Sequence, residues 1–296
     1  YKLYNSKIII NMISDDIIYE YPNCDRLVII GDIHGDIKRL KNILIDAKVI
    51  NNNIEWIAEP KNTIVVQMGD QVDSLNRDDY IKDWEVLEDI EVLYFTNLID
   101  KLAQSKGGRF ISIIGNHEFM NVIGNFSYVS RKSLNNDLVK RHNLFKPKGT
   151  LSPILCKRPI ILKIGDLLFC HAGLTLDHIN LLKKYDKDIS YINKIWRNFV
   201  LHSNVLKEDK ELFDKILLDF EGILWTRNLN SPKELKTMIN NLGCSFMFVG
   251  HTVMNGVKLY ENSVWYTDTG ISRAFGTNNY QYLEIIGHQI YIKEIK

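Results

Sequence analysis

Five short segments of this chain bring together residue types that bind metal ions. Each segment holds aspartate, asparagine or histidine beside a glycine or close to one, and each follows a short apolar run. The five segments are Gly31-Asp32-Ile33-His34-Gly35, Gly69-Asp70-Gln71-Val72-Asp73, Gly115-Asn116-His117-Glu118, His171-Ala172-Gly173 and Gly250-His251-Thr252. Because glycine lets the backbone turn sharply and approach a ligand closely, the polar residues of these turns can point into one shared site.

The side chains of these segments favour a particular kind of metal site. The candidate ligands among them are aspartates, histidines and one asparagine without a thiolate, a set that suits manganese, iron or zinc rather than a structural zinc–sulfur site. The set is too large for one tetrahedral ion. It fits better with two ions that share a carboxylate, about 3.5–4 Å apart as in two-metal hydrolases. Taken singly, residues 31–35 could form a surface turn and His171 could be a core histidine, but five such segments rarely arise together by chance.

The apolar runs before the segments predict buried β-strands, because they are short and rich in β-branched or aromatic residues. They cover residues 27–30, 63–68, 109–114, 166–170 and 244–249. In open α/β sheets, ligands bind at the carboxyl ends of the strands. We therefore expect the five strands to deliver their polar segments to one edge.

The residues between the strands predict helices. Residues 36–47 and 79–105 carry apolar side chains at three- and four-residue steps, and the second stretch ends at Gly107-Gly108. Residues 176–222 are also helical in pattern and could form a cap over the site. The C-terminal tail has three runs typical of antiparallel strands, at residues 264–267, 282–286 and 290–292. The pattern as a whole indicates a layered α/β fold with a β-rich C-terminal part.

Composition narrows the class of protein. The chain has 296 residues, 45% hydrophobic and 25% charged, with 37 basic and 36 acidic side chains. This balance gives no basic field for a nucleic acid partner, which argues against a nuclease. No apolar run reaches the roughly 18 residues that a membrane span needs. The four cysteines are scattered, so we expect free thiols and an intracellular, cytoplasmic location.

The order of the five motifs, GDxHG, GDxxD, GNHE, HAG and GHT, resembles the calcineurin-like metallophosphoesterase superfamily. The GNHE motif and the spacing are most similar to PPP-type serine/threonine phosphatases, in the bacterial-like branch that includes diadenosine-tetraphosphatase-like enzymes. The resemblance implies an α-β-β-α sandwich. Because the motifs span residues 31–252, we expect a single catalytic domain over residues 1–296, with residues 176–222 as a helical cap insertion.

The resemblance also implies roles for individual residues. Two divalent ions, manganese or else iron or zinc, are expected on six ligands: Asp32 and His34 for the first ion, Asp70 as the bridge, and Asn116, His171 and His251 for the second. His117 is the expected general acid, and Asp73 orients its ring. A hydroxide held between two cations is a strong nucleophile near neutral pH, and His117 would protonate the leaving oxygen.

The chain departs from the family pattern at one position. PPP phosphatases usually continue the second motif as Asp-Arg-Gly, where this chain has Asp73-Ser74-Leu75. The missing arginine would clamp the substrate phosphate, so its loss weakens catalysis or implies a substitute. Arg227 lies in a segment similar to one that supplies a phosphate-binding arginine in the family, and it is the first candidate for substrate binding. The weaker candidates, each more typical of a solvated surface residue, are Arg77, Arg131, Arg158 and Arg273.

Three functions follow from this pattern. The first is a dinuclear metal-dependent phosphatase that hydrolyses phosphate monoesters, including phosphoserine or phosphothreonine on proteins. The second is a nucleotide pyrophosphohydrolase acting on dinucleoside polyphosphates or capped RNA, and the third is a weakly active scaffold. The expected partner is a phosphorylated protein or a small phosphate compound, with neither a membrane nor a nucleic acid indicated. The oligomeric state does not follow from the sequence.

Overall fold

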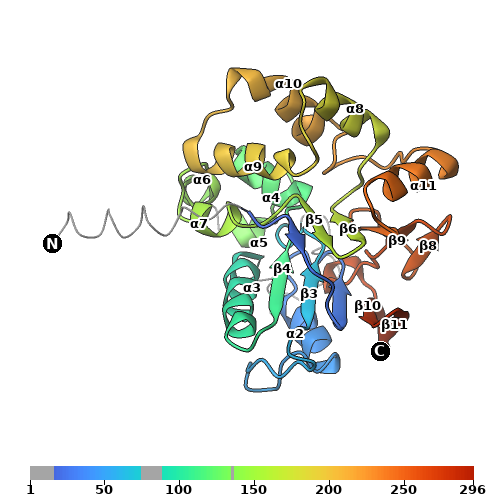
Figure 1. The fold of residues 1–296 in the computed structure, drawn as a ribbon. Coiled ribbons are helices and arrows are strands. Elements are labelled where there is room, and N and C mark those ends of the chain that lie inside the picture. Colours follow the sequence, from blue (N-terminus) through green and yellow to red (C-terminus); the bar gives the residue numbers. More distant parts are fainter. Residues whose placement is uncertain (1–16, 75–88, 135–136) are drawn as a thin grey trace.

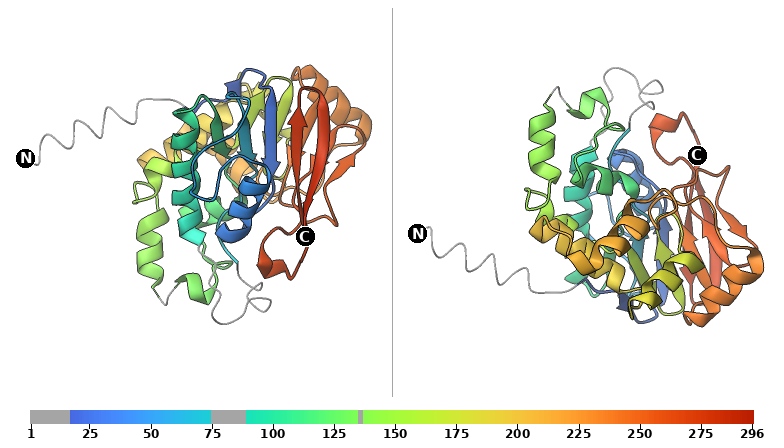
Figure 2. Two further views of the ribbon diagram at one scale, coloured as in Figure 1. Left: turned by 90° about the horizontal axis from the view of Figure 1, so that it is seen from below. Right: turned by 90° about the horizontal axis from the view of Figure 1, so that it is seen from above.

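The computed structural model describes residues 17–74, 89–134 and 137–296, and at its centre two β-sheets are stacked face to face (Figure 1). Helices cover the outer face of each sheet, so the layers follow the order α-β-β-α. This arrangement confirms the fold class expected from the sequence. Two further views show strands β10 and β11 at one side of the molecule and helix α3 at the other (Figure 2).

The first sheet has five strands. In spatial order they are β11 (Gln289–Ile295), β10 (Tyr280–Ile286), β2 (Arg26–Ile30), β3 (Ile64–Gln67) and β4 (Arg109–Ser112). Strands β2, β3 and β4 are parallel, and β10 pairs antiparallel with both β2 and β11. Because β2 and β3 lie inside a largely parallel sheet, every residue of both strands is buried.

The second sheet has six strands. In spatial order they are β1 (Glu20–Tyr21), β5 (Ile161–Ile164), β6 (Leu167–Cys170), β7 (Phe246–Val249), β9 (Val264–Tyr266) and β8 (Lys258–Tyr260). Strands β6, β7 and β9 run parallel, while β5 pairs antiparallel with β6. The carboxyl ends of β6 and β7 therefore lie at the same edge of this sheet.

Alternate side chains of the strands form two kinds of core. Ile29 and Val66 point between the sheets, where they meet Phe169 and Phe248, whose rings stack with centroids 5.0 Å apart. Residues on the opposite face of the first sheet, such as Val65, pack against α2 (Ile37–Asp46) and α3 (Asp89–Gln104). This alternation gives each strand two apolar faces and fixes its register.

A larger group of helices covers the second sheet. They are α4 (Asn116–Val122), α6 (Leu138–Phe145), α7 (Ser152–Leu155), α8 (Leu176–Lys184), α9 (Tyr191–His202), η2 (Lys207–Asp209), α10 (Lys210–Leu212), η3 (Phe213–Leu218) and α11 (Pro232–Asn241). Trp196 of α9 is fully buried in the cluster that also holds Leu168 and Met247 of the sheet. Short α5 (Arg131–Leu134) and η4 (Arg273–Phe275) lie in connecting segments.

Most predicted elements are confirmed, and the differences concern pairing. The expected helix over residues 36–47 is α2, and α3 is the described part of the helix expected over 79–105; residues 75–88 lie outside the described residues. Strand β9 pairs antiparallel with β8 but also parallel with β7, so the tail is not purely antiparallel and contributes to both sheets. The single domain and the cap role of residues 176–222 stay predictions.

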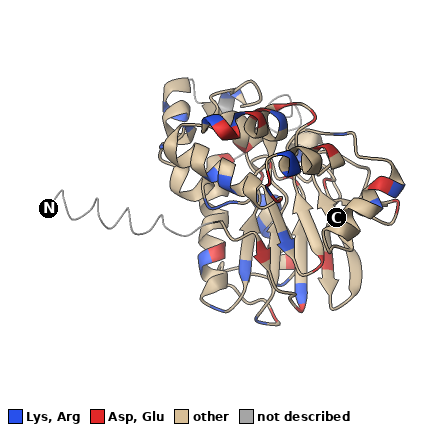
Figure 3. Ribbon diagram, turned by 45° about the horizontal axis from the view of Figure 1, so that its top comes forward, with Lys and Arg blue, Asp and Glu red and all other residues tan. Residues whose placement is uncertain are grey.

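The distribution of charged residues and the state of the cysteines match what the composition led us to expect. Acidic and basic residues are interspersed along the ribbon in Figure 3. All four cysteines are free thiols, and three of them are buried. Across the described ranges, no helix combines the length and the apolar character that crossing a membrane requires.

Candidate metal centre

The loops after five strands meet at one edge of the sandwich. They follow β2, β3 and β4 of the first sheet and β6 and β7 of the second. The backbone N–H groups of Ile33 and His34 both donate to the carbonyl oxygen of Asp70, at 3.0 and 2.9 Å. In the second sheet, the N–H of Gly250 donates to the carbonyl of His171 at 2.8 Å. These bonds connect the first loop to the second and the fourth to the fifth.

Four site residues adopt a left-handed backbone conformation. The φ angles are 44° at His34, 48° at Asp70, 66° at Asp73 and 61° at His251. For residues other than glycine, this conformation costs on the order of 1–3 kcal/mol each and persists only where the surrounding structure enforces it. Such concentrated strain is typical of functional sites, because it aims side chains where a relaxed turn would not.

Two groups of potential ligands share one aspartate. The ligand atoms of His34, Asp70 and His117 lie within 4.8 Å of one another, and so do those of Asp70, His171 and His251. Asp70 Oδ1 accepts the backbone N–H of His117 at 3.0 Å, which leaves Oδ2 facing the histidines. Oδ2 lies 3.2 Å from His171 Nε2 and 3.9 Å from His34 Nε2. Asp70 therefore occupies the position that a bridging carboxylate would need.

Asn116 joins the second group through its side-chain oxygen. Asn116 Oδ1 lies 2.9 Å from His171 Nε2 and 3.0 Å from His251 Nδ1. One amide oxygen and two imidazole nitrogens thus converge with the carboxylate of Asp70. The four residues are those expected around the second ion.

Asp32 supplies a direct indication that a cation fits here. Its Oδ2 accepts the backbone N–H of His251 at 3.0 Å, but its buried Oδ1 has no hydrogen-bond partner among the described residues. A Cβ on Gly250 would lie 2.3 Å from that Oδ1, so glycine is needed to leave room for the carboxylate. Because an unpaired buried charge is costly, a divalent ion bound here would supply the partner that this oxygen lacks.

The carboxyl groups of the site differ in their electrostatic surroundings. Burial, together with the nearby carboxylates of Asp268 and Asp70, raises the pKa of Asp32 well above its usual value. Burial acts in the same direction on Asp70, but the charges of His171 and His117 outweigh it and hold the pKa of Asp70 well below its usual value. The opposite pKa shifts of these two neighbouring carboxyl groups indicate that positive charge is lacking around Asp32 but present around Asp70.

The two histidines of the second group also differ. Burial alone would lower the pKa of His171, but the carboxylate of Asp70 outweighs this effect and raises it. Burial and the neighbouring His171 lower the pKa of His251 to about 3. His251 is therefore neutral at physiological pH, which is the form that binds metals.

His117 lies between the first group and a hydrogen-bonded carboxylate. Its Nδ1 is 3.0 Å from Asp73 Oδ2, and its Nε2 is 3.7 Å from Asp70 Oδ2. The ring of Tyr128 packs edge-on against it with centroids 5.1 Å apart. With Nδ1 held by Asp73, only Nε2 faces the site, where it can hold an ion or deliver a proton. The roles of His117 and Asp73 remain those predicted from the sequence.

Several residues of the site had no predicted role. The Glu118 carboxylate accepts the backbone N–H groups of Asp70, Gln71 and Gly115 at 3.0, 2.7 and 2.8 Å, tying two loops together. Its place in the GNHE motif was a visible signal. Asn121 lies four residues after His117 on α4, so helical spacing could also have indicated it. Arg141 donates hydrogen bonds to the carboxylates of both Asp73 and Asp89. No sequence pattern indicated either Arg141 or Asp89.

Comparison with known proteins places this geometry in a family. The family model described as calcineurin-like phosphoesterase matches residues 25–255. The chain belongs to the calcineurin-like phosphoesterase family. Shewanella-like protein phosphatase 1 of Plasmodium berghei is 31% identical over 285 residues, covering 90% of this chain and 73% of the relative. Shewanella-like protein phosphatase 2 of Arabidopsis thaliana is 34% identical over 206 residues, 54% of this chain and 49% of its own length.

Solved structures show the same fold at low identity. A cold-active protein-tyrosine phosphatase of a psychrophilic Shewanella superposes with a TM-score of 0.74 at 22% identity, over 96% of this chain and 84% of its own. A protein serine/threonine phosphatase from Saccharomyces cerevisiae gives 0.63 at 16% identity, over 100% and 90%. Membership of this phosphoesterase family implies divalent metal ions, and the donor set described above fits them.

The arginines of this phosphoesterase lie in different surroundings. Arg227 is exposed at the site, where its Nη1 donates to the carbonyl of His251 and to Thr252 Oγ1, both at 3.2 Å. Arg273 pairs with Asp36 at 2.9 Å. Ser74, which replaces the usual arginine, is completely buried. Arg131 is exposed at the start of α5. Arg77 lies outside the described residues.

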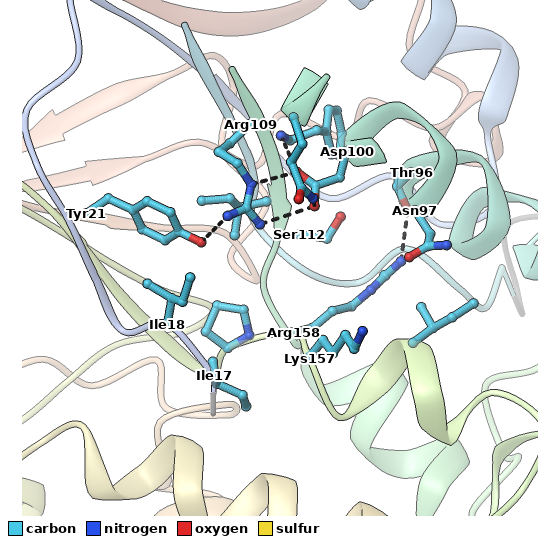
Figure 4. Close-up of a pocket in the computed structure, with 15 residues that line it drawn as sticks. Ile17, Ile18, Tyr21, Thr96, Asn97, Asp100, Arg109, Ser112, Lys157 and Arg158 are labelled. Carbon is cyan, nitrogen blue, oxygen red and sulfur yellow. Dashed lines mark hydrogen bonds and ion pairs between the residues drawn. The ribbon is translucent and has the colours of Figure 1, made fainter. Parts of the chain in front are cut away.

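Arg158 lies in a different pocket of about 230 Å³, lined by α3, β4 and residues 154–159 (Figure 4). Its Nη2 donates to Thr96 Oγ1 at 2.9 Å and to the carbonyl of Leu93 at 3.0 Å. Burial lowers the pKa of Arg158 to about 10. Its Nη1 also donates to Gln71 Oε1 at 2.5 Å, so these bonds tie the guanidinium to α3 and to the loop after β3. Among the candidate arginines that the structure describes, Arg227 is an exposed one that contacts the loop carrying His251.

The low pKa of His251 predicts a pH-dependent stability. The unfolded chain binds a proton on this histidine near the ordinary value of 6.5, and the folded chain only near 3. Stability of the metal-free protein should therefore fall as the pH drops below 6.5, by up to about 1.4 kcal/mol per pH unit from this group. Urea denaturation between pH 7 and 4 should show a shallower fall for His251→Gln. An exposed-histidine control, His202→Gln, should keep the wild-type slope; equal slopes in all three proteins would contradict the prediction.

Proposed function

We propose that this chain is a dinuclear metal-dependent phosphatase that hydrolyses phosphate monoesters on proteins. The observation that carries the proposal is the position of Asp70, which belongs to both ligand groups and so would bridge two ions. The proposed ligands follow the sequence prediction, with Asp32 and His34 for one ion, Asp70 for both, and Asn116, His171 and His251 for the other. The first ligand group joins His34 with His117 rather than with Asp32, whose assignment rests on its unpaired buried oxygen. Manganese is the proposed ion, with iron or zinc as alternatives for the same donors.

The bound ions would supply a nucleophile from water near neutral pH and neutralise charge on the phosphoryl group. The chain's own residues complete the reaction. His117 would give the proton on its Nε2 to the ester oxygen as the bond from phosphorus to that oxygen breaks. Asp73 holds Nδ1 of the same ring at 3.0 Å and so keeps Nε2 directed at the site. Arg227, at the exposed rim, would bind the phosphoryl oxygens in place of the arginine missing at Ser74.

Phosphoserine and phosphothreonine are the first proposed substrates, and one observation favours phosphotyrosine as a second. The ring of Tyr128 is 45% exposed and packs against His117, the proposed proton donor to the leaving group. An aromatic leaving group would lie beside that ring and gain a stacking contact of about 0.5–1.5 kcal/mol. The names of the relatives support a protein substrate, since two are called protein phosphatases.

A substrate panel tests this function. Manganese-loaded protein would be incubated with phosphoserine, phosphothreonine and phosphotyrosine peptides, with diadenosine tetraphosphate and with capped RNA. We expect phosphate release from the peptides and slower cleavage of the two anhydrides. Cleavage of the anhydrides alone would favour a pyrophosphohydrolase, and no turnover by fully loaded protein would favour a scaffold.

Replacing Arg227 tests the proposed phosphate contact in the same assay. Arg227→Ala should lower kcat/KM for every phosphopeptide by roughly ten- to a hundredfold, the value of one or two charge-assisted hydrogen bonds. Metal content should not change, because the guanidinium contacts a carbonyl and a hydroxyl rather than the proposed ligand atoms. Arg131→Ala, an exposed arginine of α5, is the matched control. Equal activity of both variants would exclude Arg227 as the phosphate clamp.

A further inference from the structure

Arg141 of α6 connects three elements behind the candidate acid. Its side chain is only 2% exposed. Its Nη2 donates to Asp73 Oδ1 at 2.9 Å and to Asp89 Oδ2 at 2.8 Å, and its Nε donates to Asn121 Oδ1 at 2.7 Å. The partners come from the loop after β3, from α3 and from α4. A guanidinium placed so deeply cannot bind the substrate, so its role must be exerted through these partners.

The bond from Arg141 to Asn121 determines how the asparagine amide is oriented. Because Oδ1 accepts from Arg141, Nδ2 must point the other way, toward Asp73. There Nδ2 lies 3.0 and 2.9 Å from the two carboxylate oxygens, and 2.9 Å from the carbonyl of His117. The orientation of one amide thus links the arginine to both members of the candidate acid pair.

Both carboxylate oxygens of Asp73 therefore accept hydrogen bonds. Oδ1 accepts from Arg141 and Asn121, and Oδ2 accepts from Asn121 and His117. The arginine is itself fixed, because its guanidinium packs 4.9 Å above the ring of Phe145, which is fully buried. A carboxylate with four such bonds has one orientation available, and that orientation sets the plane of the His117 ring.

We propose that Arg141 is a positioning residue for the general acid of this phosphatase, acting through Asp73 and Asn121 to aim His117 Nε2 at the leaving oxygen. The inference rests on the proposed function, since it assigns His117 the proton transfer. General acid catalysis contributes roughly 10²–10⁴-fold, and misplacement by about 1 Å can cost 10²-fold. Losing the arginine should therefore remove much of the acid's contribution while leaving the ligand groups in place.

The test uses substrates that differ in their need for an acid. Phenyl phosphate has a poor leaving group that requires protonation, whereas 2,4-dinitrophenyl phosphate leaves readily without it. Arg141→Lys and Arg141→Met should lose about 30- to 100-fold in kcat/KM on phenyl phosphate and less than about threefold on 2,4-dinitrophenyl phosphate. The matched control is Arg26→Met, which removes a buried arginine paired with Glu284 at 2.7 Å. This control should affect both substrates equally.

A double variant separates positioning from a merely structural role. In the His117→Asn background, adding Arg141→Met should cause no further loss on phenyl phosphate, because the two residues act in one step. Multiplying losses, or equal losses on the two substrates for Arg141→Met alone, would overturn the proposal. Metal content should match the wild type in every variant, and loss of metal in Arg141→Met but not in Arg26→Met would also overturn the proposal, because the arginine would then act on the ligand groups.

A spectroscopic readout decides the question independently of turnover. In metal-free protein labelled with ¹⁵N-histidine, the Nδ1 proton of His117 should be visible because it is held by Asp73, and His117→Asn assigns its signal. Arg141→Met should broaden or remove this signal, while Arg26→Met should retain it. A signal unchanged in Arg141→Met would refute the positioning role. If wild-type protein instead cleaves no phosphate ester but shows these signals, the proposed function fails and the positioning of His117 stands.

Discussion

Asp70→Asn is expected to lower phosphatase turnover by about 10³-fold or more and to remove most of the bound metal. Among the described residues, only Asp70 appears in both ligand groups, so a single change would weaken both proposed ion sites at once. The amide keeps the size of the side chain and one acceptor oxygen, but it loses the charge that neutralises two cations. Its neighbours would also change, because the carboxylate of Asp70 is what raises the pKa of His171.

The measurement combines metal analysis of purified protein with kcat on an aryl phosphate. A matched control is Asp100→Asn, which removes a partly buried carboxylate paired with Arg109 at 2.9 Å, in the pocket of Figure 4. The control should bind both ions and keep turnover close to that of the wild type. An Asp70→Asn protein that retains two ions and turnover within about tenfold would show that another residue bridges the site.

The strands and their polar ends could be predicted because both depend on local pattern. Each of the five predicted runs became a strand, and each motif lies at a carboxyl end. Pairing could not be predicted, because it depends on contacts far apart in sequence. Strand β9 illustrates this, since Phe248 on β7 lies opposite Trp265 on β9 although nothing near either residue specifies the partner. The very short β1, with two residues, has no detectable pattern of its own.

In the candidate site, too, the residues set by local sequence pattern could be predicted and those set by distant contacts could not. The residues that meet at the strand ends were found because glycine and ligand types recur in fixed motifs. Arg141 was not found, because it reaches Asp73 from 68 residues away on an ordinary amphipathic helix. The departure from the family pattern at Ser74 was informative because it directed attention to other arginines. Ser74 is completely buried, whereas Arg227 is exposed and contacts the loop that carries His251, so Arg227 stays the first candidate for the phosphate contact.

Gly115→Ala is expected to have the second largest effect, through geometry alone. The backbone at Gly115 has φ −101° and ψ 177°, which alanine adopts without strain. An added Cβ, however, would lie 2.2 Å from Asp70 Oδ1 and 2.4 Å from Asp70 N. The methyl group must therefore displace the shared carboxylate, or the start of α4 that carries His117. We expect about a 10²-fold loss of turnover and reduced metal content.

Two further glycine variants test whether crowding by the added methyl group or a general loss of stability causes the loss of activity in Gly115→Ala. Gly250→Ala would place its Cβ 2.3 Å from Asp32 Oδ1, so it should weaken metal binding from the Asp32 side. Gly287, in the turn between β10 and β11, has φ +59° and nothing within 4 Å of an added Cβ. Its alanine variant should lose roughly 1 kcal/mol of stability and keep both ions and turnover, because only backbone strain is introduced. If Gly115→Ala and Gly287→Ala lose activity in proportion to stability, crowding of Asp70 is not the cause. If only the two site variants lose metal, the close approach of glycine to carboxylate is what the glycines of the third and fifth motifs preserve.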